Sequence, residues 1–418
     1  MNKEQLYFAP FRTAPKAFTI FYYALCISLL YLLMAPKEYD FITGDYYSQL
    51  SSILQGHELK PAGGIILDRY PPIIPYLFSA FFTLSKIFHA APQIFYIIYS
   101  AIAISTATVF VYKIATLLLS HHVSILASLL FASCPFIQFG IIRVASEPTY
   151  IMLLYAAAYL LINMYIQRRY RLLSFIAIGA LLGLAMLTRP AGILFPILFA
   201  LFILFAFPVP FTKRLLFAFV LLVSSLLTIA PWEYAISRQE GYLVPLSTGG
   251  PISIWDGLRF NNCKHRAHLN LSPAAQQISD TVATHIHDFK SNTVPFLKEQ
   301  FHRAPSAFLE LIVLKVLRSW YALESQNKHL EAFNIILISI YLILAFIGAS
   351  SYLKKDGKQK MAIPIFFLSI IFYSWTMTTI VLSILRYISP VLGFIFIFSA
   401  QGLYAIWPKN TAHLPNRN

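Results

Sequence analysis

The chain has 418 residues, of which 58% are hydrophobic and 12% are charged, and its mean hydropathy is +0.66. This composition excludes an ordinary soluble domain and indicates an integral membrane protein. The formal charge of +15 is concentrated in short connectors beside apolar runs, which fits membrane topology and anionic lipid headgroups and predicts no nucleic-acid partner.

Apolar runs of membrane-spanning character follow one another along most of the chain. They are continuous and do not alternate with polar residues, which predicts helices and excludes barrel strands. The expected fold class is therefore an all-α polytopic membrane protein. The runs lie at about 17–35, 73–88, 93–119, 123–142, 148–166, 172–188, 191–209, 215–231, 333–352, 362–384 and 388–407.

Basic connectors predict the orientation of these runs. The short connectors QRRYR (167–171), TKRL (212–215) and KKDGKQK (354–360) carry nine Lys and Arg residues, and the positive-inside rule places all three on the cytoplasmic face. Even numbers of spans separate them, so the three assignments agree.

The run at 73–88 decides where the preceding loop, 36–72, lies. A full span would place that loop on the opposite face from Glu147, whereas a re-entrant helix would place both on the outer face. The run is the shortest and opens with three prolines, so we expect a re-entrant or juxtamembrane helix. About ten helices would then cross the membrane, and the polar residues would converge on the outer face.

Four motifs carry a resemblance to a known family. The stretch GDYYSQLSSILQG (44–56), followed by DRYPPIIPYL (68–77), resembles the first external loop of GT-C glycosyltransferases. The branch it is most similar to contains protein O-mannosyltransferases, the aminoarabinose transferase acting on lipid A, and RgtA/B/C/D-like bacterial enzymes. RVASEPTY (143–150), AMLTRPAGILF (185–195) and LRYISPVLGFIF (385–396) resemble three later signatures, in the same order.

The resemblance implies a GT-C-like fold and an inverting transfer of a sugar from a polyprenyl-phosphate donor on the extracytoplasmic face. The acidic residue after the first span matches Asp45, and the acidic residue before the Pro-Pro pair matches Asp68. One departure is that Arg69-Tyr70 stands where the aminoarabinose transferase has Glu-Lys. Metal and phosphate roles at those positions therefore cannot simply be copied.

The same resemblance suggests a division of the chain into three parts. Residues 1–231 would form the GT-C transmembrane module with the external loop 36–72. Residues 232–332 would form an extracytoplasmic loop with an amphipathic interfacial helix near 305–325, and 333–418 would be C-terminal transmembrane helices.

Inverting transfer needs a base for the acceptor hydroxyl and a positive clamp for the leaving phosphate. Asp45 is the expected base, and arginine suits the clamp because its charge is permanent and its donors form a fork. The expected substrate-binding residues are Asp68, Arg69, Tyr70, Arg143, Glu147, Arg189 and Arg386.

Each assignment has a structural alternative. Asp45 could cap the helix that follows it, and Asp68 with Arg69 could be a loop ion pair. Arg143 and Glu147 could be an interfacial pair four residues apart.

Headgroup snorkelling is a further alternative for Arg189 and Arg386, and we favour phosphate binding over it only for Arg386.

The expected partners are a polyprenyl-phosphate sugar donor, a glycan, lipid or protein acceptor, and membrane lipids. No cofactor is certain from the sequence, which leaves the need for a divalent metal open. The expected location is a bacterial inner membrane with the site facing the periplasm. A transporter or lipid flippase is the alternative from another class, and an O-antigen ligase or polymerase is an enzymatic alternative.

Overall fold

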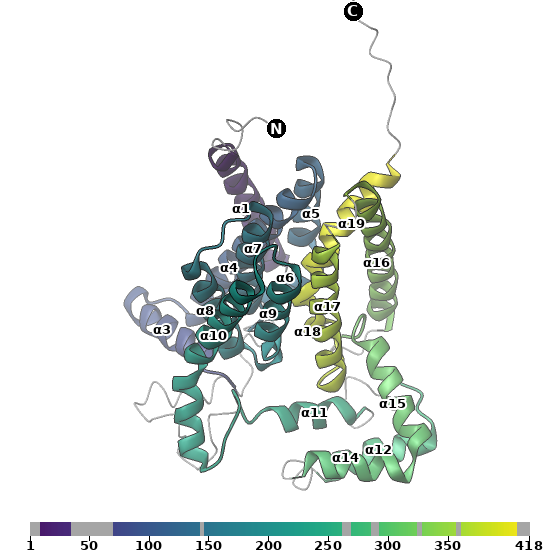
Figure 1. Cartoon of the computed structure of the whole chain (residues 1–418). Coiled ribbons are helices and arrows are strands. Elements are labelled where there is room, and N and C mark those ends of the chain that lie inside the picture. The colour runs from purple at the N-terminus through teal and green to yellow at the C-terminus, as the bar shows by residue number, and fades with distance from the viewer. Residues whose placement is uncertain are drawn as a thin grey trace, which may run out of the picture.

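The computed structural model describes residues 9–34, 70–142, 146–260, 269–285, 292–323, 328–356 and 361–407, and every regular element within these ranges is helical. Figure 1 shows an upright helix bundle with a smaller layer of helices beneath it. The predicted all-α class is confirmed.

The bundle is built from long apolar helices with shorter ones between them. Its elements are α1 (Ala9–Met34), α3 (Ile73–Phe88), α4 (Pro92–Leu118), α5 (His121–Ser133), α6 (Pro135–Ile142), α7 (Glu147–Gln167), α8 (Leu172–Thr188), the 3-10 turn η3 (Pro190–Gly192), α9 (Phe195–Ala206), α10 (Phe211–Glu240), α16 (Lys328–Asp356), α17 (Ala362–Ile380), α18 (Leu385–Ile388), η6 (Ser389–Val391) and α19 (Leu392–Ile406).

Within the described ranges, seven helical segments are long and apolar enough to cross a membrane, and four shorter apolar helices accompany them. Each of the eleven predicted apolar runs coincides with a helix or a helix pair. The helix α3 has 16 residues, so it is about 24 Å long, shorter than a hydrocarbon core of roughly 30 Å. This length agrees with the re-entrant reading, which remains a prediction.

Two helix boundaries differ from the sequence-based expectation. The run 123–142 is divided at Cys134, whose backbone is extended before Pro135, because proline disfavours the α conformation in the residue before it. The run ending at 231 continues as α10 through Pro231 to Glu240. The expected boundary at residue 231 therefore falls inside a helix.

Helix α19 is the central element of the bundle. Its apolar side chains are buried together with those of α4, α5, α7 and α17 in one continuous core. Against α16 it crosses at Gly348 and Gly402, where an added Cβ would collide with the carbonyl oxygens of Phe398 and Leu344. Small residues at this crossing let the two backbones approach, as is common between membrane helices.

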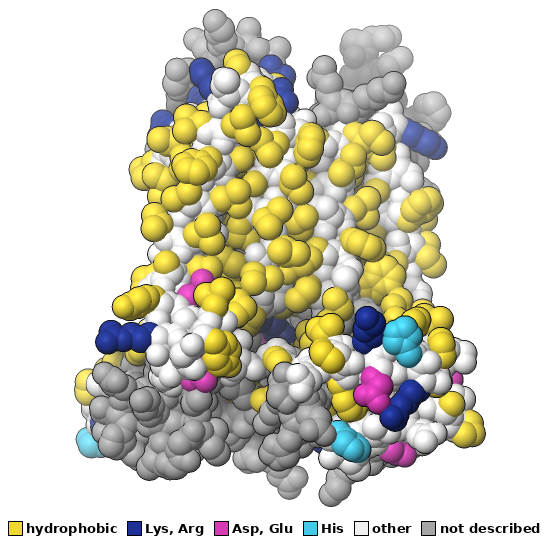
Figure 2. Space-filling view, turned by 60° about the horizontal axis from the view of Figure 1, so that its bottom comes forward, with side chains coloured by type: hydrophobic (Ala, Val, Ile, Leu, Met, Phe, Trp, Pro, Cys, Tyr) yellow, Lys and Arg dark blue, Asp and Glu magenta, His cyan; other side chains and the backbone are white. Residues whose placement is uncertain are grey.

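The space-filling view shows how polarity is distributed over one face (Figure 2). A broad belt of hydrophobic side chains covers the middle of the bundle, with Lys and Arg side chains above it. Below it, Lys, Arg, Asp, Glu and His side chains are mixed. An apolar belt between two polar ends is the surface that a lipid bilayer requires.

The lower layer in Figure 1 consists of four shorter helices with a small core of their own. These are α11 (Gly250–Leu258), α12 (Pro273–Thr284), α14 (Thr293–Arg303) and α15 (Pro305–Arg318). Leu258, Phe260, Ile278, Val282 and Leu311 are buried together there. The amphipathic helix expected near 305–325 corresponds to α15.

Polar contacts attach this layer to the bundle. The Lys315 ammonium of α15 is buried and donates hydrogen bonds to the carbonyl oxygens of Gly257 (3.2 Å), Ile380 (3.3 Å) and Val381 (2.8 Å). It thereby joins the end of α11 to the end of α17. A cation at a helix C-terminus is also favoured by the negative end of the helix dipole.

Candidate functional site

The candidate site lies where three helix ends meet. Glu147 is the first residue of α7, Arg189 lies between α8 and η3, and Arg386 lies in the short helix α18. The basic segment QRRYR joins the other ends of α7 and α8. The site is therefore at the end of the bundle opposite to that connector.

One carboxylate holds two guanidinium groups. Glu147 Oε1 lies 2.6 Å from Arg189 Nη1 and 2.6 Å from Arg386 Nε. Arg386 Nη2 also donates to Glu147 Oε2 at 3.5 Å. The N-terminal position in α7 favours the negative charge of Glu147, because the helix dipole is positive there.

The three side chains differ in exposure. The side chain of Glu147 is 2% exposed, that of Arg189 is 11% exposed, and that of Arg386 is 28% exposed. Among the contacts between described residues, two guanidinium groups face one carboxylate. Arg386 is its most accessible member.

Arg189 has a further aromatic contact. Its guanidinium carbon lies 4.3 Å from the centre of the Tyr387 ring, within the range of a cation–π contact. Its Nη1 nitrogen is buried against Glu147 Oε1 at 2.6 Å. The Arg189 guanidinium is therefore held between a carboxylate and an aromatic ring.

The turn that carries Arg189 is fixed from α17. The Tyr373 hydroxyl donates to the carbonyl oxygen of Ala191 at 2.8 Å and accepts from the Leu194 amide at 3.3 Å. Gly192 lies against Tyr150, and a Cβ at this glycine would be 3.2 Å from the tyrosine ring. These contacts hold the turn close to α7 and α17.

The structure brings together three of the residues expected from the sequence, namely Glu147, Arg189 and Arg386. Tyr70 is described and directly precedes the Pro-Pro pair before α3. The remaining expected residues, Asp45, Asp68, Arg69 and Arg143, lie outside the described residues, and their roles stay predictions.

Two contributors were not identified from the sequence. Tyr387 follows Arg386 directly, so its place in the LRYISP motif is the one signal that could have pointed to it. Tyr373 stands in an apolar helix with no motif around it, and its contact with the Arg189 turn joins residues that are 182 positions apart.

The described residues do not form a metal centre. No group of three or more His, Cys, Asp or Glu side chains gathers within the described ranges. Glu147, the carboxylate of the cluster, contacts two guanidinium groups, and these would repel a divalent cation. The charge of the Glu147–Arg189–Arg386 cluster therefore does not fit a bound divalent metal.

Comparison with known proteins shows what this chain is similar to. Residues 69–234, less than half of the chain, match the family model described as dolichyl-phosphate-mannose-protein mannosyltransferase. No curated protein matches the sequence.

Solved structures of an archaeal oligosaccharyltransferase from Archaeoglobus fulgidus share the fold. The complex of this enzyme, AglB, with an inhibitory peptide and a dolichol-phosphate has a TM-score of 0.55 at 15% sequence identity and covers 93% of this chain. A complex with Zn and sulfate has a TM-score of 0.54 at 17% identity, also over 93%. A form tethered to an acceptor peptide containing the NVT sequon has a TM-score of 0.55 at 16% identity over 93% of this chain.

This chain spans about half the length of the archaeal enzyme, 50% in the first of these structures and 49% in the other two. At such low identity the likeness shows the fold. The matched segment 69–234 contains Glu147 and Arg189. The chain therefore has the fold of the archaeal oligosaccharyltransferase, and part of it matches the mannosyltransferase family model.

Proposed function

We propose that this protein is a membrane glycosyltransferase that moves a sugar from a polyprenyl-phosphate-linked donor to a lipid, glycan or protein acceptor, with inversion, on the extracytoplasmic face. The observation that carries the proposal is the Glu147–Arg189–Arg386 cluster, in which one carboxylate orients two guanidinium groups and one of the two arginines is partly exposed. The partial match to a mannosyltransferase family model supports the same reading.

The cluster suits the phosphate end of such a donor. Arg386 is oriented by two contacts with Glu147 and still has part of its side chain exposed. A fixed guanidinium recognises phosphate oxygens better than a mobile one because less side-chain entropy is lost on binding. Arg189 adds positive charge behind it. Arg69, Tyr70, Arg143 and Asp68 are proposed to complete the donor site.

In the proposed reaction, Asp45 takes the proton of the acceptor hydroxyl as the hydroxyl oxygen attacks the anomeric carbon of the sugar. The bond between the anomeric carbon and the phosphate oxygen breaks on the opposite face, so the configuration inverts. The leaving phosphate gains negative charge, which Arg386 and Arg189 stabilise electrostatically. The products are the glycosylated acceptor and a polyprenyl phosphate.

The basic connectors support this orientation. The site is at the end of α7 and α8 opposite to QRRYR, and the positive-inside rule predicts the cytoplasmic side for QRRYR. A bacterial inner membrane with the site facing the periplasm remains our proposal for the location. The archaeal structures contain a dolichol-phosphate and an acceptor peptide, so a lipid-linked donor and a protein acceptor are both reasonable probes.

The test is sugar transfer by the purified protein in nanodiscs with a panel of polyprenyl-phosphate sugars. The wild type is compared with Asp45→Asn, and polyprenyl-phosphate binding is measured in parallel. We expect Asp45→Asn to lose transfer and keep binding. Unchanged transfer would reduce Asp45 to a helix cap. No transfer by the wild type with any donor, together with movement of a lipid or solute across vesicles, would favour the transporter alternative.

A further inference from the structure

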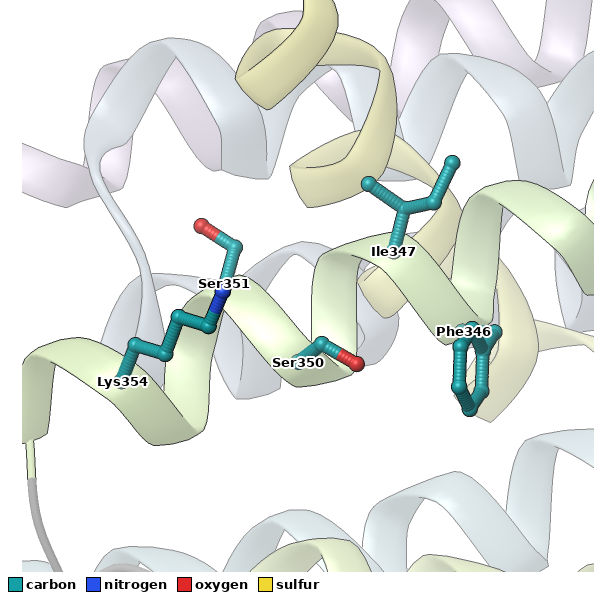
Figure 3. Close-up of a pocket in the computed structure, with 5 residues that line it drawn as sticks. All are labelled: Phe346, Ile347, Ser350, Ser351 and Lys354. Atoms are coloured by element: carbon teal, nitrogen blue, oxygen red, sulfur yellow. The ribbon is translucent and has the colours of Figure 1, made fainter.

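A groove on α16 lies at the end of the bundle opposite to the candidate site. It has a volume of about 470 Å³ and is lined by Phe346, Ile347, Ser350, Ser351 and Lys354 (Figure 3). All five residues belong to the second half of α16. The groove therefore lies near the basic connector KKDGKQK, far from Glu147 along the bundle axis.

Helix α16 leaves one side uncovered. Its opposite side crosses α19 closely at Gly348, whereas Ile336 is 61% exposed, Ile343 is 60% exposed and Phe346 is 75% exposed. Such an apolar side is expected to face lipid chains in a membrane protein. The groove lies at the end of this apolar side.

Polarity changes in one direction along the groove. Phe346 and Ile347 form its apolar part, the hydroxyls of Ser350 and Ser351 follow, and the Lys354 ammonium closes it. In Figure 3 the Lys354 side chain extends along the helix toward Ser351. The Ser351 hydroxyl also accepts a hydrogen bond from Gln401 Nε2 of α19 at 3.4 Å, which fixes this side of the groove.

The charge at the polar end of the groove indicates which kind of amphiphile it would bind. Lys354 has no ion-pair partner among the side chains that the structure describes. Between residues 354 and 360 the sequence has four lysines and one aspartate. Basic residues beside a span attract anionic lipid headgroups.

A second copy of the chain fits less well. A two-fold symmetric contact through this groove would place Lys354 of both copies side by side, where like charges repel. A soluble anion would leave Phe346 and Ile347 without a partner. An anionic lipid satisfies both parts of the groove.

We propose that this groove binds one anionic phospholipid, with the headgroup phosphate on Lys354, the glycerol region at Ser350 and Ser351, and an acyl chain along Phe346 and Ile347. The inference is independent of the proposed transfer reaction. Ammonium suits a phosphate as a compact point charge with three donors. The groove would be a lipid site distinct from the Glu147–Arg189–Arg386 cluster.

Native mass spectrometry of the detergent-purified full chain tests the proposal with phosphatidylglycerol and phosphatidylcholine of identical acyl chains. We expect the wild type to bind phosphatidylglycerol about tenfold more tightly, and Lys354→Ala to lose this preference, because a charge-assisted contact is removed. Lys213→Ala is the matched control, since Lys213 is an exposed lysine in another basic connector. It is expected to keep the preference.

A second variant tests the groove itself. Ser350→Trp fills the groove and keeps Lys354, so it is expected to weaken the binding of both lipids, with folding confirmed by far-UV circular dichroism. Equal binding of the two lipids by the wild type would overturn the proposal, as would equal losses in Lys354→Ala and Lys213→Ala. Unchanged lipid binding by folded Ser350→Trp would also overturn it. A dimer that only Ser350→Trp abolishes, with lipid binding unchanged, would assign the groove to a second copy.

Discussion

Two clusters of arginine and glutamate differ in how exposed their side chains are. This difference distinguishes a structural role from a role in ligand binding. In the first, Arg318 of α15 and Glu331 of α16 form a two-pronged pair, with distances of 3.0 and 3.4 Å. Their side chains are 1% and 8% exposed, and the Leu323 amide donates a further hydrogen bond to Glu331 at 3.2 Å. Protein atoms therefore enclose both side chains almost completely.

The second cluster is more open. Glu147 faces two guanidinium groups, and the side chain of Arg386 is 28% exposed. A closed pair holds elements together, whereas a partly exposed arginine that a carboxylate holds in place can also contact an anion. We therefore assign the Arg318–Glu331 pair to attachment of the lower layer, and the Glu147 cluster is the site that we propose for phosphate binding. Substitutions should lower stability at the first cluster and donor binding or transfer at the second.

The largest effect is expected on stability, at the closed pair. Glu331→Gln leaves the buried Arg318 without a counter-charge, so the free energy of unfolding should fall by about 3–5 kcal/mol. Unfolding in mixed micelles measures the change. A double variant, Arg318→Met with Glu331→Leu, should recover much of the loss because no buried charge remains. Equal stability of wild type and Glu331→Gln would show that the pair is solvated in the membrane-bound protein.

The next effect is expected on transfer, at the open cluster. Arg386→Gln should lower the transfer rate by about 100-fold, as when a charged donor is lost from a preorganised site. Glu147 keeps Arg189 as its partner in this variant, so the loss of stability should stay small. The matched control is Arg259→Gln, because Arg259 is 29% exposed, pairs with Asp256 at 2.8 Å and lies over Trp255. Similar transfer losses in both variants would contradict the assignment.

A smaller effect is expected from the aromatic contacts. Tyr387→Leu removes the ring from beneath Arg189 and should weaken polyprenyl-phosphate binding by about fivefold, corresponding to about 1 kcal/mol. In the closed pair, the guanidinium carbon of Arg318 lies 5.8 Å from the centre of the Tyr321 ring. Tyr321→Leu removes that ring and should affect stability only. Binding assays on both variants separate the two roles. Weaker binding in Tyr321→Leu alone would reverse the assignment.

The smallest effect is expected in the lower layer, outside the membrane. Glu310 accepts hydrogen bonds from the Ser272 hydroxyl (2.5 Å) and the Ser272 amide (2.9 Å), and these lower the pKa of its carboxyl. The stabilisation is present above the unfolded-state pKa of about 4.3 and is lost as the pH falls through the lower folded-state pKa. Because Glu310 is largely solvated, the effect should be below about 1 kcal/mol.

Unfolding of the wild type and of Glu310→Gln over the acidic range measures this dependence. The variant lacks the carboxyl, so the difference in stability between the two proteins should shrink as the pH falls. A difference that stays constant with pH would show that the Ser272 contact does not depend on the charge.

Most of the fold could be predicted because it rests on continuous apolar runs. The residues at which helices end were harder to predict. Cys134 interrupts a run that is apolar throughout, and α10 continues past Pro231 because tertiary contacts outweigh the helix-breaking tendency of proline. The lower layer was predicted only as far as α15, where apolar and charged residues alternate with helical spacing.

Three residues of the candidate cluster could be predicted, but their pairing could not. The motifs RVASEPTY, AMLTRPAGILF and LRYISPVLGFIF pointed to Glu147, Arg189 and Arg386, and the parity of the spans predicted that they lie on one face. The contact between Glu147 and Arg386 joins residues 239 positions apart, and span order does not say which helix ends touch. Headgroup snorkelling for Arg189 gives way to a buried ion pair, because its partner comes from another helix.

The most direct test of phosphate binding by the open cluster is the dissociation constant of a polyprenyl phosphate for the protein in nanodiscs. Wild type, Arg386→Gln and Arg259→Gln are compared at one ionic strength, with folding verified for each. The account predicts about tenfold weaker binding for Arg386→Gln and wild-type binding for Arg259→Gln. Equal binding by all three proteins would contradict the assignment of the Glu147–Arg189–Arg386 cluster to the donor phosphate.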